Sequence, residues 1–335
     1  MPTQVNTILR SSHRGGSLNI LCAATHERYQ SNLAQLPYTF WSWQGQNIKP
    51  WNREYGELPH NYILLNPELG NQQIPLNVDI DLVLSQNKFG QFQVMKAIAT
   101  QLGCPLISLE HTLPPDNWTN SQLVPHKEMA GDVNVFISEY SMGKWGWGAG
   151  EGNAQVIHHG VDTEVFKPDD SIEREPIVCS VVNDWINREW CCHFSLWQKV
   201  TDYPNSKWKL NVWGNTPGLS KSTDGVAHLV KELNRSSVFL NTSKISPIPY
   251  SVLEAMACEI PVVSAATCMI PEIIQNGVNG FISNDPATLR GYVDKLLSDK
   301  ELSLQIGRAA RKTILEKFSM SNFLEKWNNL FWSVL

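Results

Sequence analysis

The sequence lacks the features that mark several classes of protein. Its 335 residues contain no apolar stretch long enough to cross a bilayer, no internal repeat and no low-complexity segment. None of the seven cysteines forms a C-x-x-C pair, and no cluster of His and Asp residues has the spacing of metal ligands. The first residues show no basic segment followed by an apolar core. We therefore expect a cytoplasmic protein with reduced thiols and no metal site.

The chain also lacks an excess of basic charge. Its formal net charge of -5 gives no electrostatic reason to expect a nucleic-acid-binding protein. Hydrophobic residues make up 42% and charged residues 18% of the chain, which is typical of a globular protein. The length is sufficient for two domains.

Short apolar runs alternate with helix-compatible stretches, a pattern typical of parallel α/β architecture. Strands are predicted over 18–23, 38–41, 81–85, 105–109, 133–138, 177–182, 208–213, 237–241 and 260–264. Helices are predicted over 30–36, 89–102, 190–200, 251–257 and from 286 onward, and Gly103 is placed to end the second of them. The fold class is therefore α/β, with two doubly wound domains.

The polar segment over 168–176 is bounded by prolines and is predicted to link the domains. We predict an N-terminal domain over 1–168, a C-terminal domain over 169–315, and a C-terminal helix over 316–335 that packs back toward the N-terminal domain. In open parallel sheets, ligands bind beyond the carboxyl ends of the strands.

The stretch over 246–264 is the most informative part of the sequence. A proline-rich loop precedes a helix whose first residues are Tyr250 and Ser251, and the N–H groups of such a helix start suit a diphosphate. Glu254 follows one turn later, where a carboxylate could accept hydrogen bonds from ribose hydroxyls. The alternative is that Glu254 complements the helix dipole on a solvated face. Spacing alone favours this alternative.

This stretch resembles the donor-binding signature of glycosyltransferase family 4. The residues that carry the resemblance are Leu253-Glu-Ala-Met-Ala-Cys-Glu-Ile-Pro-Val-Val, then Ile270-Pro-Glu-Ile-Ile and Asn276-Gly-Val-Asn-Gly-Phe. A weaker match, His158-His-Gly-Val-Asp, resembles the interdomain motif of the family, with His159 in place of Asn. The resemblance implies a GT-B fold, in which two Rossmann-like domains face each other across a cleft. It also implies a nucleotide-sugar donor, UDP or GDP, with no other cofactor.

The chain departs from the family pattern at three further places. Ser246 stands where the family has the first Glu of its Glu-x7-Glu motif, and Glu259 replaces a glycine, so we expect a different turn there. The family's diphosphate clamp aligns with Asn183 in the Arg place and Arg188 in the Lys place. Arg188 is assigned to phosphate, although a surface salt bridge with a neighbouring carboxylate is the simpler alternative.

Other candidates follow predicted strands. Gly214 resembles a family turn near the nucleotide base, although turn chemistry alone could require it. His111 follows a predicted strand at a place where family members often have a His near the donor sugar, although a lone His is more often structural. His26 and Glu27 are acceptor-side candidates. The catalytic candidates are therefore His111, Arg188 and Ser246.

The resemblance implies a retaining, metal-independent glycosyltransferase that moves a sugar to a hydroxyl acceptor. The acceptor is left open among a glycan, a lipid-linked sugar, a small molecule and a modified nucleobase. Three alternatives remain: a virus-encoded enzyme acting on hydroxymethylated DNA bases, an inactive GT-B-like binding protein suggested by Ser246, and a nucleotide-sugar epimerase of the same fold.

Overall fold

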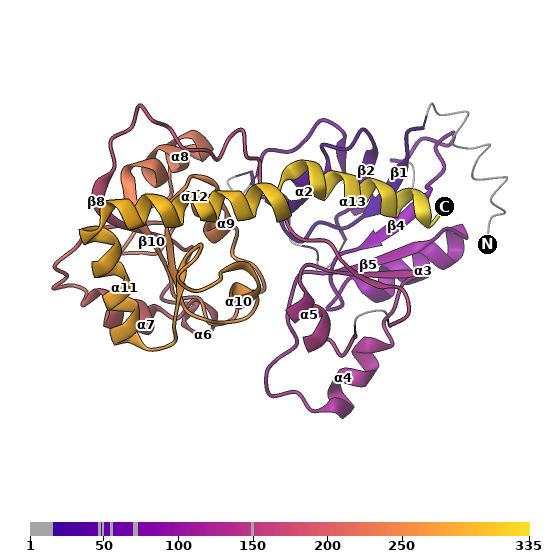
Figure 1. The fold of residues 1–335 in the computed structure, drawn as a ribbon. Coiled ribbons are helices and arrows are strands. Elements are labelled where there is room, and N and C mark those ends of the chain that lie inside the picture. Colours follow the sequence, from indigo (N-terminus) through magenta and orange to yellow (C-terminus); the bar gives the residue numbers. More distant parts are fainter. Residues whose placement is uncertain (1–15, 46–47, 49, 54–55, 70–72, 149–150) are drawn as a thin grey trace. The chain divides into compact units, whose positions relative to one another are not determined.

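The computed structural model describes residues 16–45, 48, 50–53, 56–69, 73–148 and 151–335. The chain divides into two compact units, which we call unit 1 (Met1–His158 with Ser321–Leu335) and unit 2 (His159–Met320). In Figure 1 unit 1 runs from indigo to magenta and includes the yellow C-terminal helix, whereas unit 2 runs from rose to orange-yellow. Each unit contains one parallel β-sheet, as the alternation predicted.

The sheet of unit 1 has seven strands in the order β3-β2-β1-β4-β5-β6-β7. Its strands are β1 Asn19–Cys22, β2 Thr39–Trp43, β3 Tyr62–Leu65, β4 Leu82–Ser85, β5 Leu106–Glu110, β6 Val133–Phe136 and β7 Ala154–Val156. The central strands β4 and β5 are buried along their whole length, as expected for a parallel sheet covered on both faces. The strand order reverses between β1 and β4, which creates a topological switch point at the carboxyl ends of those two strands.

In the part of unit 1 that the structure describes, five α-helices and one short 3-10 helix accompany the sheet. They are α2 Glu27–Leu33, η1 Pro67–Leu69, α3 Phe92–Leu102, α4 Asn120–Lys127, α5 Glu139–Lys144 and α13 Met320–Ser333, of which α13 enters unit 1 at Ser321. Gly103 ends α3 in the left-handed conformation (φ 64°), as predicted. The C-terminal helix is held in unit 1 by buried Trp327, whose Nε1 donates to the Tyr29 hydroxyl at 2.9 Å.

The sheet of unit 2 has five strands in the order β12-β11-β10-β8-β9. They are β8 Glu175–Val181, β9 Lys209–Trp213, β10 Ser236–Asn241, β11 Val262–Ser264 and β12 Phe281–Ile282. The helices are α6 Glu189–Cys192, α7 Phe194–Thr201, α8 Gly225–Arg235, α9 Tyr250–Ala257, α10 Ile270–Ile273, α11 Pro286–Ser298 and α12 Lys300–Lys317. The single helix predicted over 190–200 is wrong, because His193 adopts a left-handed φ of 55° and divides it into α6 and α7.

The division between the units falls after His158, upstream of the boundary predicted after residue 168. The intervening segment is bonded to elements of unit 2. Val161 N donates to Phe318 O at 2.8 Å, and Arg311 Nη1 donates to Phe166 O at 3.2 Å. The polar segment predicted as the linker therefore lies inside unit 2 and leads into β8.

Candidate functional site

The carboxyl ends of β8 and β10 form the switch point of the unit 2 sheet. Strand β8 pairs with β9 on one side and with β10 on the other, so the chain winds in opposite directions from this pair. The loop after β8 carries Asn183 and Arg188, and the loop after β10 carries Ser246 and leads to Tyr250. The topology thus brings most of the predicted donor-site segments to one edge of one sheet.

The loop after β8 presents Arg188 to solvent. Its shape is set by Asp184, which has a φ of 46° and whose N–H donates a hydrogen bond to Asn215 Oδ1 at 2.7 Å. Among the described residues, Arg188 forms no ion pair, and its guanidinium reaches only the carbonyl oxygen of Asn183, at 3.5 Å. The Glu189 carboxylate instead accepts from Ser195 N and Oγ, at 3.1 and 2.5 Å. The simple salt-bridge alternative for Arg188 is therefore not what the structure shows.

Gly214 closes β9 against the loop after β8. Its φ is 134°, and a Cβ atom at this position would lie 2.0 Å from the carbonyl oxygen of Val182. A side chain is sterically excluded there. The close packing of two backbone segments thus requires this glycine, independently of any ligand.

Helix α9 begins at Tyr250, after the N-cap residue Pro249. The side chain of Pro249 makes no cap hydrogen bond, so the cap leaves the anion-binding end of the helix without a side-chain acceptor. The Tyr250 ring stacks on His159, with centroids 4.3 Å apart and an interplanar angle of 13°. His159, which replaces the Asn of the family motif, therefore orients the first residue of α9. Ser246 is half-buried in the preceding loop.

Glu254 is 3% exposed, one turn into α9. The alternative that placed this carboxylate on a solvated helix face is therefore wrong. Burying a carboxylate costs several kcal/mol unless hydrogen-bonding partners compensate. A buried carboxylate in a helix whose start points at the switch point is typical of a binding site rather than of a solubilising face.

The turn after α9 keeps the shape that a glycine would make. Glu259 has a φ of 58°, its N–H donates to Met256 O at 3.1 Å, and Ile260 N donates to Ala255 O at 3.0 Å. These two bonds form a Schellman motif. Our expectation of a different turn at Glu259 is thus wrong, because the left-handed conformation is retained by a residue that has a Cβ atom.

In unit 1 the predicted residues lie at the carboxyl ends of β1 and β5. His26 is exposed and caps α2, with its Nδ1 accepting from Tyr29 N at 3.4 Å, and Glu27 is buried and accepts from Asn52 N at 3.0 Å. His111 follows β5, and its Nε2 lies 3.3 Å from Gln86 Oε1. Burial, with a smaller contribution from the nearby His26, lowers the pKa of His111 to about 3, so the ring is neutral near pH 7.

Sequence reasoning missed the buried polar residues that surround His111. Glu110 is 1% exposed; its Oε2 accepts from Lys88 N at 2.9 Å and its Oε1 from Thr112 N at 2.8 Å. Burial raises the pKa of Glu110 and lowers that of the Lys88 ammonium to about 8. Gln86 is fully buried. The sequence does contain a sign of these residues, because a polar run directly follows the apolar segment that forms β4.

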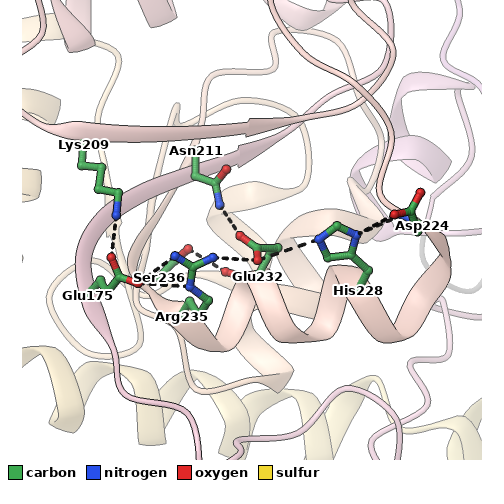
Figure 2. A network of polar contacts seen from close by, with 8 residues as sticks. All are labelled: Glu175, Lys209, Asn211, Asp224, His228, Glu232, Arg235 and Ser236. Carbon is green, nitrogen blue, oxygen red and sulfur yellow. Dashed lines mark hydrogen bonds and ion pairs between the residues drawn. The ribbon is translucent and has the colours of Figure 1, made fainter.

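A second polar network lies at the opposite edge of the unit 2 sheet, where β8 and β9 begin (Figure 2). Glu175 accepts from Lys209 Nζ at 2.5 Å and from Arg235 Nη2 at 2.7 Å. Glu232, 5% exposed, accepts from Asn211 Nδ2 at 2.8 Å and from Arg235 Nη1 at 2.9 Å. Since ligands bind at the carboxyl ends of such sheets, we assign this network to stability.

Neither a metal cluster nor a membrane span is found in the part of the chain that the structure describes. No three His, Cys, Asp or Glu side chains gather there as a metal site would require. Each helix described is too short or too polar to cross a bilayer.

Comparisons with known proteins agree with this geometry. Residues 220–313, which include α9 and Glu254, match the model of the family "Glycosyl transferases group 1". The similarity to this family is therefore shown for residues 220–313, which make up less than half of the chain. A curated relative, N-acetyl-alpha-D-glucosaminyl L-malate synthase of Bacillus anthracis, is 31% identical over 114 residues, which are 33% of this chain and 29% of the relative. Alpha-maltose-1-phosphate synthase of Mycolicibacterium smegmatis is 32% identical over 108 residues, or 30% and 28% of the two chains.

These curated relatives are thus matched over less than a third of their length. The likeness of folds extends further. The crystal structure of Anabaena HepE in complex with UDP superposes with a TM-score of 0.73 at 17% identity, covering 95% of this chain and 100% of that one. The predicted GT-B fold is confirmed.

Proposed function

We propose that the protein is a retaining glycosyltransferase that takes a sugar from a UDP-sugar and transfers it to an acceptor hydroxyl. The observation that supports this most is the burial of Glu254 in α9, inside the family-matched segment and at the switch point of unit 2. The neighbouring Anabaena HepE structures hold UDP, UDP with glucose, or UDP-glucose, which favours a uridine nucleotide over a guanosine nucleotide.

In this proposal each part of the unit 2 edge has one task. The Arg188 guanidinium and the start of α9, with Tyr250 and Ser251, bind the diphosphate. The Glu254 carboxylate accepts hydrogen bonds from the ribose hydroxyls, and Asn183 with the backbone near Gly214 contacts the remainder of the nucleotide. Ser246 is assigned to the transferred sugar. In unit 1, His111 is assigned to recognition of a sugar hydroxyl, and His26 with Glu27 are assigned to the acceptor.

The chemical step breaks the bond between the anomeric carbon and the diphosphate oxygen. The acceptor hydroxyl attacks from the face that the diphosphate leaves, and its proton goes to the departing phosphate. Arg188 and the helix start stabilise the charge that develops on the diphosphate, as preorganised dipoles do at other anionic transition states. We propose that no metal ion is needed, because these groups supply the positive potential.

Calorimetric titration with UDP and UDP-glucose tests this assignment. Glu254→Ala and Arg188→Ala should each weaken UDP binding at least tenfold, about the effect of losing one charge-assisted hydrogen bond. Arg308→Ala removes another exposed arginine of unit 2, and Glu232→Ala removes an equally buried carboxylate from the stability network. These two controls should keep UDP affinity. Unchanged affinity in both site variants would refute the proposed donor site.

A binding protein without transferase activity is the second candidate, and Ser246 in place of the family Glu favours it. The slow hydrolysis of UDP-glucose, followed by NMR without an acceptor, separates the two. We expect turnover by the wild-type protein and faster turnover by Ser246→Glu. If the protein binds UDP-glucose but no variant hydrolyses it or transfers its glucose to an acceptor, the binding function is correct.

A further inference from the structure

A chain of buried polar side chains crosses unit 1 and ends at His111. The Tyr62 hydroxyl accepts from Cys22 Sγ at 3.3 Å and donates to Gln30 Oε1 at 3.2 Å. Gln30 Nε2 in turn donates to Gln86 Oε1, and His111 Nε2 lies 3.3 Å from that same oxygen. Cys22, Gln30 and Gln86 are fully buried and Tyr62 is 2% exposed, so water does not compete for these bonds.

The direction of the chain follows from its first member. Burial raises the pKa of the Cys22 thiol to about 12, so the sulfur keeps its proton and remains a weak acceptor. The Tyr62 hydroxyl therefore donates its hydrogen bond to the amide oxygen of Gln30. The amide nitrogen of Gln30 therefore faces Gln86, and the side-chain oxygen of Gln86 accepts the hydrogen bond from it. Because an amide oxygen only accepts, the nitrogen of His111 that faces it carries a proton.

We propose that Gln86 is a positioning residue that holds His111 as the neutral tautomer protonated on Nε2, with Nδ1 as the acceptor nitrogen of the ring. The orientation of the ring is fixed from a second side, since Tyr29 meets His111 edge-on with centroids 4.5 Å apart. Tyr29 is itself held by the hydrogen bond from Trp327 of α13. The contact with Gln86 thus sets the tautomer of His111, and the contact with Tyr29 sets the orientation of its ring.

The tautomer decides which ligand group His111 suits. A neutral ring that accepts through Nδ1 pairs with a donor such as a sugar hydroxyl, whereas a protonated ring would favour a phosphate oxygen. The identity of this ligand rests on the proposed function. The tautomer itself does not, because it depends only on side chains of unit 1.

Nuclear magnetic resonance of the protein labelled with ¹⁵N-histidine tests the assignment at pH 7. Two-bond ¹H–¹⁵N correlations should show His111 protonated on Nε2 in the wild-type protein and in Gln86→Glu, which keeps an acceptor. In Gln86→Met, which removes the acceptor at similar size, the Nδ1-protonated form should appear. Gln101→Met makes the same change at an exposed residue of α3 in unit 1, and should leave the His111 signals unchanged.

An Nδ1-protonated or doubly protonated His111 in the wild-type protein would overturn the proposal, and this measurement needs no variant to fold. An unchanged His111 spectrum in Gln86→Met would overturn it as well.

Kinetics then show whether positioning matters for transfer. Gln86→Met should lower kcat about tenfold while the Kd for UDP stays unchanged, and Gln86→Glu should recover kcat to within about threefold of the wild type. A parallel loss of UDP affinity would show a general structural role instead and refute positioning. If the wild-type protein binds no UDP-sugar, the proposed function fails, while the NMR measurement still decides the assignment of Gln86.

Discussion

The two sheet edges that carry the candidate residues are built by different means. At the edge of unit 2, the loops are shaped by backbone conformation. The non-glycine residues of positive φ in the described part of the chain all lie in unit 2. Asp184, His193 and Cys268 follow β8 and β11 at the carboxyl edge of the sheet, whereas Asp202 and Glu259 precede β9 and β11 at its amino edge. In unit 1, every described residue of positive φ is a glycine. There, buried polar side chains that bond to one another, from Gln30 through Gln86 to His111, shape the edge instead.

This difference teaches which perturbation each unit resists. A backbone-shaped edge tolerates changes of its exposed side chains, such as Arg188, but fails when a Cβ atom meets a neighbouring carbonyl group. An edge made of buried polar groups does not depend on left-handed non-glycine residues at its turns. It is sensitive instead to any change in the protonation of those buried groups. Each unit should therefore be broken most easily by the kind of change that the other withstands.

The largest effect is expected for Gly214→Ala. The new Cβ atom would lie 2.0 Å from Val182 O, so β9 or the loop after β8 must move, at a cost of about 4 kcal/mol in the free energy of unfolding. Gly218→Ala is a matched control in the same loop. It also has a positive φ (75°), but its Cβ atom would meet nothing within 4 Å, so it should cost only about 1 kcal/mol. Urea denaturation gives both values. Equal losses would show that φ alone, and not the close approach, requires Gly214.

The success of sequence reasoning also differs between the units. In unit 2, strands β8 to β11 were predicted nearly at their observed positions, because β8, β10 and β11 contain apolar runs and β9 alternates polar and apolar residues. In unit 1, the short strands β3 and β7 were missed. Strand β7 has only three residues and none of them is buried, so its apolar signal is weak.

The missed site residues have a common physical cause. Gln86, Lys88 and Glu110 are buried polar groups whose burial is stable only because distant residues complete their hydrogen bonds. Such partners are neighbours in the fold and not in the sequence, so residue type and spacing predict solvated loops there. The same limit applies to Glu254, for which spacing alone favoured a solvated face.

Acid should affect unit 1 before unit 2. The pKa of His111 is lowered to about 3 in the folded protein from 6.5, so the unfolded chain takes up this proton first and stability is lost as the pH falls from about 6.5 toward 3. The pKa of Glu175 (Figure 2) is lowered from 4.5 to about 2, chiefly by its hydrogen bonds from Lys209 and Arg235. Its contribution is complete above about pH 4.5 and is lost as the pH falls toward 2.

Calorimetric melting between pH 7 and pH 3 checks this order. His111→Gln should reduce the fall in Tm between pH 6.5 and 4.5. Glu175→Gln should lower Tm by a constant amount above about pH 4.5, and its difference from the wild type should shrink as the pH falls below that value. A Tm curve of His111→Gln that runs parallel to the wild type down to pH 4.5 would contradict the neutral state of His111.

The smallest expected effect is a gain in stability from Glu259→Gly. A residue with a Cβ atom in the left-handed region costs about 1 kcal/mol or slightly more, and glycine removes that cost while adding entropy to the unfolded chain. The net gain should be about 0.5 kcal/mol in the free energy of unfolding, measured by urea denaturation. Glu259→Ala is the matched control, because it removes the same carboxylate but keeps the Cβ atom, and it should give no gain. If alanine stabilises the protein as much as glycine does, the effect comes from the lost charge near Arg174, and the left-handed backbone of unit 2 is not strained at this residue.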